Sequence, residues 1–207
     1  MNNSLKTYLF QRLQQELPGK LAQIEAIPYR KIDYGTFSMD NAKKSAVLIL
    51  FYLQENEPHI VLIQRPVYNG AHSGQIAFPG GKVEESDKDI VYTALREANE
   101  EIGIVIDDVD VVGGLTDMYI PISNFLVTPI VGFINYLPNF ILEEREVAEI
   151  INLKVSDLTN INELDTTKVN FTNNRIVNVP CFDFNGKIVW GATAVMLNEL
   201  RWVLNGR

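Results

Sequence analysis

The segment from Phe78 to Ile104 reads FPGGKVEESDKDIVYTALREANEEIGI. A Phe-Pro-Gly-Gly turn leads through a polar loop into a helical pattern that ends at Gly103. Glu97, Glu100 and Glu101 follow the spacing i, i+3 and i+4, so their carboxylates project from one side of the helix. Like charges at this spacing repel unless a cation lies among them. The segment therefore indicates a site for Mg²⁺ or Mn²⁺, which prefer oxygen ligands.

A bare run of acids at this spacing is more often the solvated face of an amphipathic helix. The residues around the run favour the metal site instead. Arg96 precedes the first acid and lies four residues before Glu100, which is an ion-pair spacing. The glycines at the start of the segment permit close approach of the backbone to a ligand.

The segment resembles the Nudix box, G-x5-E-x7-R-E-U-x-E-E-x-G-U, where U is apolar. Gly81 matches the opening glycine, and Arg96, Glu97, Glu100, Glu101, Gly103 and Ile104 match the closing half. Asp87 stands where the box has its first glutamate, and eight residues rather than seven separate it from Arg96. The resemblance implies an α/β fold, the Nudix-type α/β/α sandwich with a mixed sheet, and metal-dependent cleavage of a phosphoanhydride.

Further segments resemble the coenzyme A pyrophosphatase branch of this family. They are LIQR at 62–65, HSGQIAFPGG at 72–81, VTPIVG at 127–132 and VWGATA at 189–194. The resemblance covers about Ser45 to Leu200. However, Pro66 and Val67 replace the usual Ser-Ala, and no basic residue lies between Arg65 and His72. If such a base holds a phosphate of coenzyme A, its loss bears on the substrate and leaves the chemistry intact.

The box residues receive roles on this basis. Glu97 and Glu101, one helical turn apart, are the first choice for metal ligands, and Glu100 joins them or bridges a second ion. Arg96 orients one of the carboxylates through paired hydrogen bonds, and Asp87 is a candidate partner for Arg96. Gly80 and Gly81 let the backbone approach the substrate, and their carbonyls could also reach the metal; an ordinary tight turn would need the same glycines.

The general base and the substrate contacts are less defined. The acidic loop 143–146 offers Glu144 and Glu146, which precede the strand-like run from Val147 and could reach an attacking water. The loop could instead be simply solvated. Arg65 and His72 are candidate substrate-binding residues, although a lone histidine is more often structural.

The composition of the chain restricts the classes of binding partner that we expect. The formal net charge of −8 argues against general binding of nucleic acid, which requires a basic surface. No apolar run reaches the length of a membrane span, and no leader pattern opens the chain. Cys181 is the single cysteine, which fits the reducing cytoplasm, and its apolar neighbours favour a buried thiol. We expect a cytoplasmic enzyme with a small-molecule nucleotide substrate, no nucleic acid and no membrane partner.

The order of elements predicts one domain over residues 1–207. Residues 4–26 form a helix, or two helices broken at Pro18-Gly19, within an N-terminal helical extension over residues 1–30. This extension could pack on the core, which we favour, or contact a second copy in a homodimer. Strands are expected at 46–53, 60–64, 126–134 and 147–155, with a β-rich region at 111–119. Asn185-Gly186 predicts a hairpin, and residues 193–204 predict a final helix capped by Thr193.

Three functions remain open from the sequence. The first is a metal-dependent pyrophosphatase that acts on coenzyme A or an acyl derivative. The second is a hydrolase of another nucleoside diphosphate derivative such as ADP-ribose, which the missing base after Arg65 favours. The third is a non-catalytic binding module, against which the three intact glutamates argue.

Overall fold

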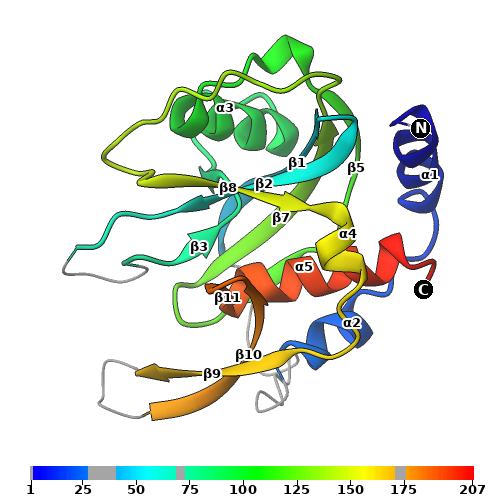
Figure 1. Cartoon of the computed structure of the whole chain (residues 1–207). Coiled ribbons are helices and arrows are strands. Elements are labelled where there is room, and N and C mark those ends of the chain that lie inside the picture. Colours follow the sequence, from blue (N-terminus) through cyan, green and yellow to red (C-terminus); the bar gives the residue numbers. More distant parts are fainter. Residues whose placement is uncertain (1, 28–40, 69–72, 171–175) are drawn as a thin grey trace.

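A computed structural model describes residues 2–27, 41–68, 73–170 and 176–207. A large mixed sheet lies between helix α3 (Ile90–Ile102) on one face and helix α5 (Gly191–Leu204) on the other, and a smaller sheet lies beside α5 (Figure 1). This layering is the predicted α/β/α sandwich. The division into one domain over residues 1–207 stays a prediction.

The large sheet is built around β1. Its eight strands have the bounds β1 Lys43–Gln54, β2 Glu57–Gln64, β3 Ile76–Ala77, β4 Gly80–Lys82, β5 Asp110–Gly114, β6 Met118–Ile120, β7 Phe125–Phe133 and β8 Glu149–Lys154. The order is β3-β2-β1-β7-β5, and β4, β6 and β8 pair with β1, β7 and β2. β1 runs parallel to β7 and antiparallel to β2 and β4. The region predicted as β-rich at 111–119 forms two strands, β5 and β6.

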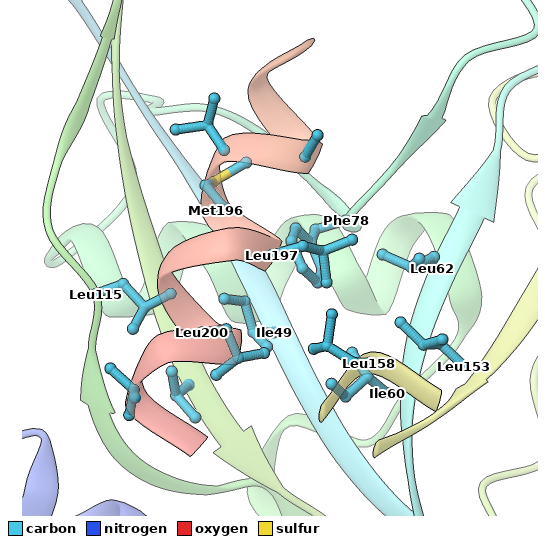
Figure 2. Packing of buried hydrophobic residues seen from close by; sticks show 14 of the residues in the cluster. Ile49, Ile60, Leu62, Phe78, Leu115, Leu153, Leu158, Met196, Leu197 and Leu200 are labelled. Atoms are coloured by element: carbon cyan, nitrogen blue, oxygen red, sulfur yellow. The ribbon is translucent and has the colours of Figure 1, made fainter. Parts of the chain in front are cut away.

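Strand β1 is apolar from Ala46 to Leu53, where both of its faces are covered. Leu48 and Leu50 belong to the cluster under α3, whereas Ile49 and Phe51 belong to the cluster under α5. Figure 2 shows the second cluster, in which Leu197 and Leu200 of α5 (Gly191–Leu204) lie against residues of the sheet. The two clusters hold α3 and α5 on opposite faces of one strand.

The smaller sheet has the order β11-β10-β9, with β9 Asp165–Asn170, β10 Ile176–Phe184 and β11 Lys187–Trp190. The predicted hairpin joins β10 to β11, and Asn185 and Gly186 have φ angles of 55° and 88°. These positive values are the ones that a two-residue hairpin turn requires. Strand β9 was not predicted.

The N-terminal extension forms two helices, α1 Asn2–Arg12 and α2 Lys20–Glu25, separated at Pro18-Gly19 as expected. Both pack near the C-terminal helix. The Asn198 side chain donates to the Ala22 carbonyl at 2.7 Å, and the Tyr8 hydroxyl donates to the Val203 carbonyl at 2.7 Å. These contacts agree with packing on the core; the homodimer stays a prediction.

The remaining elements are the 3₁₀ turn η1 Ile106–Asp108 and the short helix α4 Val155–Thr159. The predicted cap at Thr193 is wrong, because α5 begins at Gly191 after Trp190 and Thr193 lies buried within its first turn. The predicted burial of Cys181 is confirmed. No helix in the described part of the chain is both long and apolar enough to cross a membrane.

Candidate active site

Helix α3, Ile90–Ile102, positions the acidic residues of the site. Asp89 begins the helix by accepting a hydrogen bond from the Tyr92 backbone N–H at 2.7 Å. Gly103 ends it in the left-handed conformation, with φ of 71°, as the sequence predicts. The apolar face packs on the sheet, so the acids at its border lie next to strand β4, where Gly80 and Gly81 pair with β1.

The Glu101 carboxylate is buried, with the residue only 1% exposed. Its Oε2 accepts a hydrogen bond from the Gly80 backbone N–H at 2.8 Å. Its Oε1 has no hydrogen-bond partner among the described residues, and the Arg65 guanidinium lies 3.8 Å away. Burial raises the pKa of Glu101 to about 7, against the opposing effect of the Gly80 bond. A buried carboxylate oxygen without a partner is destabilising, and a bound cation would satisfy it.

Glu97 lies against the glycine pair. A Cβ atom built on Gly81 would lie 2.5 Å from the Glu97 Oε1, so only glycine leaves room for the carboxylate there. Burial raises the pKa of Glu97, and the neighbouring Arg96 opposes the rise. Glu97 and Glu101 therefore converge on Gly80-Gly81, as the expected pair of metal ligands requires.

Arg96 is held by a cluster of acceptors. Its Nε and Nη2 donate to the two oxygens of Asp87 at 2.8 and 3.1 Å, and Nη2 also donates to the Lys82 carbonyl at 3.1 Å. The Asp87 side chain is shielded from solvent and also accepts from the Thr93 hydroxyl at 2.8 Å and the Glu84 backbone N–H at 2.9 Å. The bond from Arg96 holds the pKa of Asp87 well below its usual range. The predicted partnership between Asp87 and Arg96 is confirmed.

Arg96 also connects the two glutamates that flank it. Its Nη2 donates to Glu97 Oε1 at 3.1 Å, and its Nη1 donates to Glu100 Oε2 at 3.0 Å. The Glu100 side chain is 57% exposed and is thus turned toward the outside of the cluster. No group of three or more His, Cys, Asp or Glu side chains is gathered to hold a metal within the described residues. The role of Glu100 as a third ligand stays a prediction, and it requires exchange of the Arg96 contact.

The acidic loop lies over the end of α3. Its Glu143 backbone N–H donates to the Glu101 carbonyl at 3.0 Å, and the Ala148 N–H that follows the loop donates to the Gln64 carbonyl at 2.8 Å. After burial, the charge of Glu146 is among the causes that raise the pKa of both Glu97 and Glu101. Glu144 and Glu146 both stay predictions for the general base, and the charge of Glu146 acts on both carboxylates.

Of the two substrate-binding candidates, only Arg65 lies within the described residues. Arg65 follows β2 and faces Glu101, with a side chain that is 31% exposed. His72 lies outside the described residues. The sequence did not single out Lys187, which donates to Gln64 Oε1 at 3.0 Å and to Glu149 Oε2 at 2.6 Å from the distant hairpin. No local pattern around Lys187 could have shown this contact, because it depends on how the two sheets meet.

Comparison with models of known protein families identifies the family of this chain. The NUDIX domain model matches residues 42–177, which contain the glycine pair and all of α3. The chain belongs to the Nudix family. The predicted enzyme class, a Nudix pyrophosphohydrolase, is thereby confirmed, and its coarse function is hydrolysis of a nucleoside diphosphate derivative. Nudix hydrolases in general use divalent metals such as Mg²⁺ or Mn²⁺.

Relatives of similar length carry the Nudix name. The chain is 31% identical over 168 residues to the uncharacterized Nudix hydrolase NudL of Pectobacterium atrosepticum, covering 80% of this chain and 85% of that protein. It is 33% identical over 174 residues to the NudL of Yersinia enterocolitica, covering 83% of this chain and 86% of that protein.

Solved structures confirm the Nudix fold. The Nudix hydrolase RenU from M. smegmatis superposes with a TM-score of 0.55 at 15% identity, over 80% of this chain and 87% of that one. A MutT/nudix family protein from Enterococcus faecalis gives a TM-score of 0.51 at 13% identity, over 90% of this chain and 73% of that one.

Proposed function

We propose that this Nudix hydrolase cleaves a phosphoanhydride bond in coenzyme A or an acyl-CoA. The products are adenosine 3′,5′-bisphosphate and free or acylated phosphopantetheine. The chemistry rests on one observation: the buried carboxylate of Glu101 and the partly buried carboxylate of Glu97 converge on Gly80-Gly81, and one oxygen of Glu101 has no hydrogen-bond partner among the described residues. The choice of coenzyme A rests on the segments at 62–65, 72–81, 127–132 and 189–194, which resemble the coenzyme A pyrophosphatase branch.

The residues present fit Mg²⁺ or Mn²⁺. Glu97 and Glu101 would hold the ion, with Glu100 joining them once its carboxylate leaves Arg96. Each is an oxygen donor, and the unpartnered Oε1 of Glu101 is buried beside the glycine pair. When bound, the metal supplies a Lewis acid and lowers the pKa of a coordinated water.

The other residues of the site orient the Glu97 carboxylate, bind the substrate phosphate and accept the proton of the attacking water. Arg96 holds the Glu97 carboxylate in place, and Asp87 fixes the guanidinium of Arg96 through two bonds. The partly exposed Arg65 guanidinium lies 3.8 Å from Glu101, where it can bind a substrate phosphate oxygen. As water attacks phosphorus and the bridging P–O bond breaks, the proton of the water passes to the Glu146 carboxylate.

The test is a panel of substrates with identification of the products. Coenzyme A, ADP-ribose and dinucleoside polyphosphates are each incubated with Mg²⁺ or Mn²⁺, and with EDTA as a control. We expect the highest kcat/KM for coenzyme A, loss of turnover in EDTA, and a strong loss in Glu97→Gln but not in Glu85→Gln, an exposed acid of the loop that precedes α3. A clear preference for ADP-ribose would overturn the proposed substrate.

One observation favours a second candidate function. No basic residue lies between Arg65 and His72, where the coenzyme A branch has one. If that base is the only means of holding the 3′-phosphate, the substrate is instead another nucleoside diphosphate derivative such as ADP-ribose. Equal rates on coenzyme A and on its 3′-dephosphorylated form would support this alternative.

A further inference from the structure

An open pocket of about 460 Å³ lies where the edge of the large sheet meets the smaller sheet. Gln64 and Ile76, from β2 and β3, form one wall, and residues of β9 and of the β10–β11 hairpin form the other. In Figure 1 β9 and β10 lie below β3, and β11 leads into the start of α5. The pocket is therefore built by segments that are distant in the sequence.

The lining of this pocket is cationic in an acidic protein. Lys168 and Lys187 line it, and none of its lining residues is an aspartate or glutamate, although the chain has 26 acidic against 18 basic residues. Lys168 is exposed on β9 and makes no ion pair with a described residue. Lys187 pairs with Glu149, but both side chains are exposed by a third or more, so that pair contributes little. Trp190 adds an aromatic surface on which a base could stack.

Two short stretches of chain connect the wall of this pocket to the site of Glu97 and Glu101. Gln64 of its wall is followed directly by Arg65, whose guanidinium is 3.8 Å from Glu101. Ile76 of the same wall precedes Gly80 by four residues, which span at most about 13 Å. Neighbouring residues of a strand point to opposite sides, so a ligand that reaches both places passes round the end of β2.

We propose that this pocket binds a second phosphate of the substrate, carried on the ribose, through Lys168 and Lys187. The inference rests on the proposed function, since it places the cleaved phosphoanhydride at Glu97 and Glu101. It also accounts for the missing base after Arg65, because the two lysines supply positive charge from other parts of the sequence. The substrate class is then a 3′-phosphorylated nucleoside diphosphate derivative, and the nucleoside lies toward Trp190.

Binding of the nucleotide half alone tests the pocket without turnover. Adenosine 3′,5′-bisphosphate and AMP are titrated calorimetrically into the wild-type protein, without divalent metal. We expect the bisphosphate to bind roughly tenfold tighter or more, as one charge-assisted contact in a partly exposed site gives. Lys168→Gln should lose most of this preference and Lys168→Arg should keep it. Lys154→Gln, on β8 and outside the pocket, is the matched control.

A kinetic arm separates this inference from the proposed function. The ratio of kcat/KM for coenzyme A to that for dephospho-coenzyme A should fall roughly tenfold in Lys168→Gln and in Lys187→Gln, and not in Lys154→Gln. Equal affinity of the wild type for the bisphosphate and AMP, or a bisphosphate affinity that neither substitution lowers, would overturn the pocket assignment. Failure to cleave coenzyme A while the bisphosphate preference persists would instead overturn only the proposed reaction.

Discussion

Alanine at Gly81 should separate activity from folding. The added Cβ would lie 2.5 Å from Glu97 Oε1, whereas ordinary contact begins near 3.4 Å, so the carboxylate must move by about 1 Å. Gly81 does not have a positive φ angle, so the backbone itself accepts alanine. The substitution thus displaces the Glu97 carboxylate, the proposed metal ligand, and leaves the sheet in place.

The magnitudes follow from what moves. Displacing the Glu97 carboxylate weakens its bond from Arg96 and costs about 1 kcal/mol of unfolding free energy, equivalent to about 2–4 °C in Tm. A shift of this size in a catalytic group lowers the rate by about 10²-fold. We therefore expect Gly81→Ala to lose about two orders of magnitude in kcat/KM with a nearly normal melting temperature.

Gly80→Ala is the matched control, because its Cβ meets backbone instead. The new atom would lie 2.5 Å from the Val47 Cα of β1, and Gly80 has a φ of 153°, which L-residues rarely adopt. We expect a loss of roughly 4 kcal/mol, or about 10 °C in Tm. Calorimetric melting and initial rates distinguish the two variants. Wild-type kcat/KM in Gly81→Ala would refute the assignment of Glu97 to the reaction.

Three other predictions follow from the same cluster. Asp87→Asn removes a carboxylate whose low pKa stabilises the fold above its unfolded-state value of 3.8 and less so as the pH falls below it. The variant should therefore lose less unfolding free energy than the wild type as the pH falls below 3.8. At pH 7 its unfolding free energy should be lower by about 2 kcal/mol, because Arg96 loses its charged partner. Equal stability of the two proteins at pH 7 would contradict this. Glu101 has a raised pKa, so its charge destabilises the metal-free fold as the pH rises from 4.5 through about 7. In EDTA at pH 8, Glu101→Gln should melt higher than wild type, by up to about 3 kcal/mol in unfolding free energy, and the difference should vanish below pH 4.5. Finally, Glu146→Gln should lower kcat by about 10²-fold or more, whereas Glu144→Gln should stay within a few-fold of wild type; the reverse order in stopped or continuous assays would move the base to Glu144.

The sequence predicts the elements whose signals are local. Helix α3 ends at Gly103 because glycine readily adopts the left-handed conformation, and Asn185-Gly186 turns the hairpin because asparagine and glycine both tolerate positive φ angles. Strand β1 contains the continuous apolar run from Ala46 to Leu53, which is typical of a strand buried on both faces. By contrast, β9 reads DTTKVN and has a single apolar residue, so it becomes a strand only through pairing with β10.

The candidate site likewise has features that the local sequence predicts and features that it does not. Helical spacing predicts that Glu97 and Glu101 share a side with Glu100, but it does not predict side-chain rotamers. Arg96 draws the Glu100 carboxylate outward, and the glycine pair receives the other two. The choice between Glu144 and Glu146 depends on the path of a loop, and the lysine pocket depends on how two sheets meet. Neither leaves a pattern in the local sequence.

The most direct test of the central claim is titration of the protein with Mn²⁺, followed by the paramagnetic resonance of the free ion. The wild type and Glu85→Gln should bind Mn²⁺ with similar affinity, and Glu101→Gln should bind it at least about tenfold more weakly because a buried ligand is lost. Equal affinity of Glu101→Gln and wild type would contradict the claim that Glu97 and Glu101, at the Gly80-Gly81 pair, hold the catalytic metal.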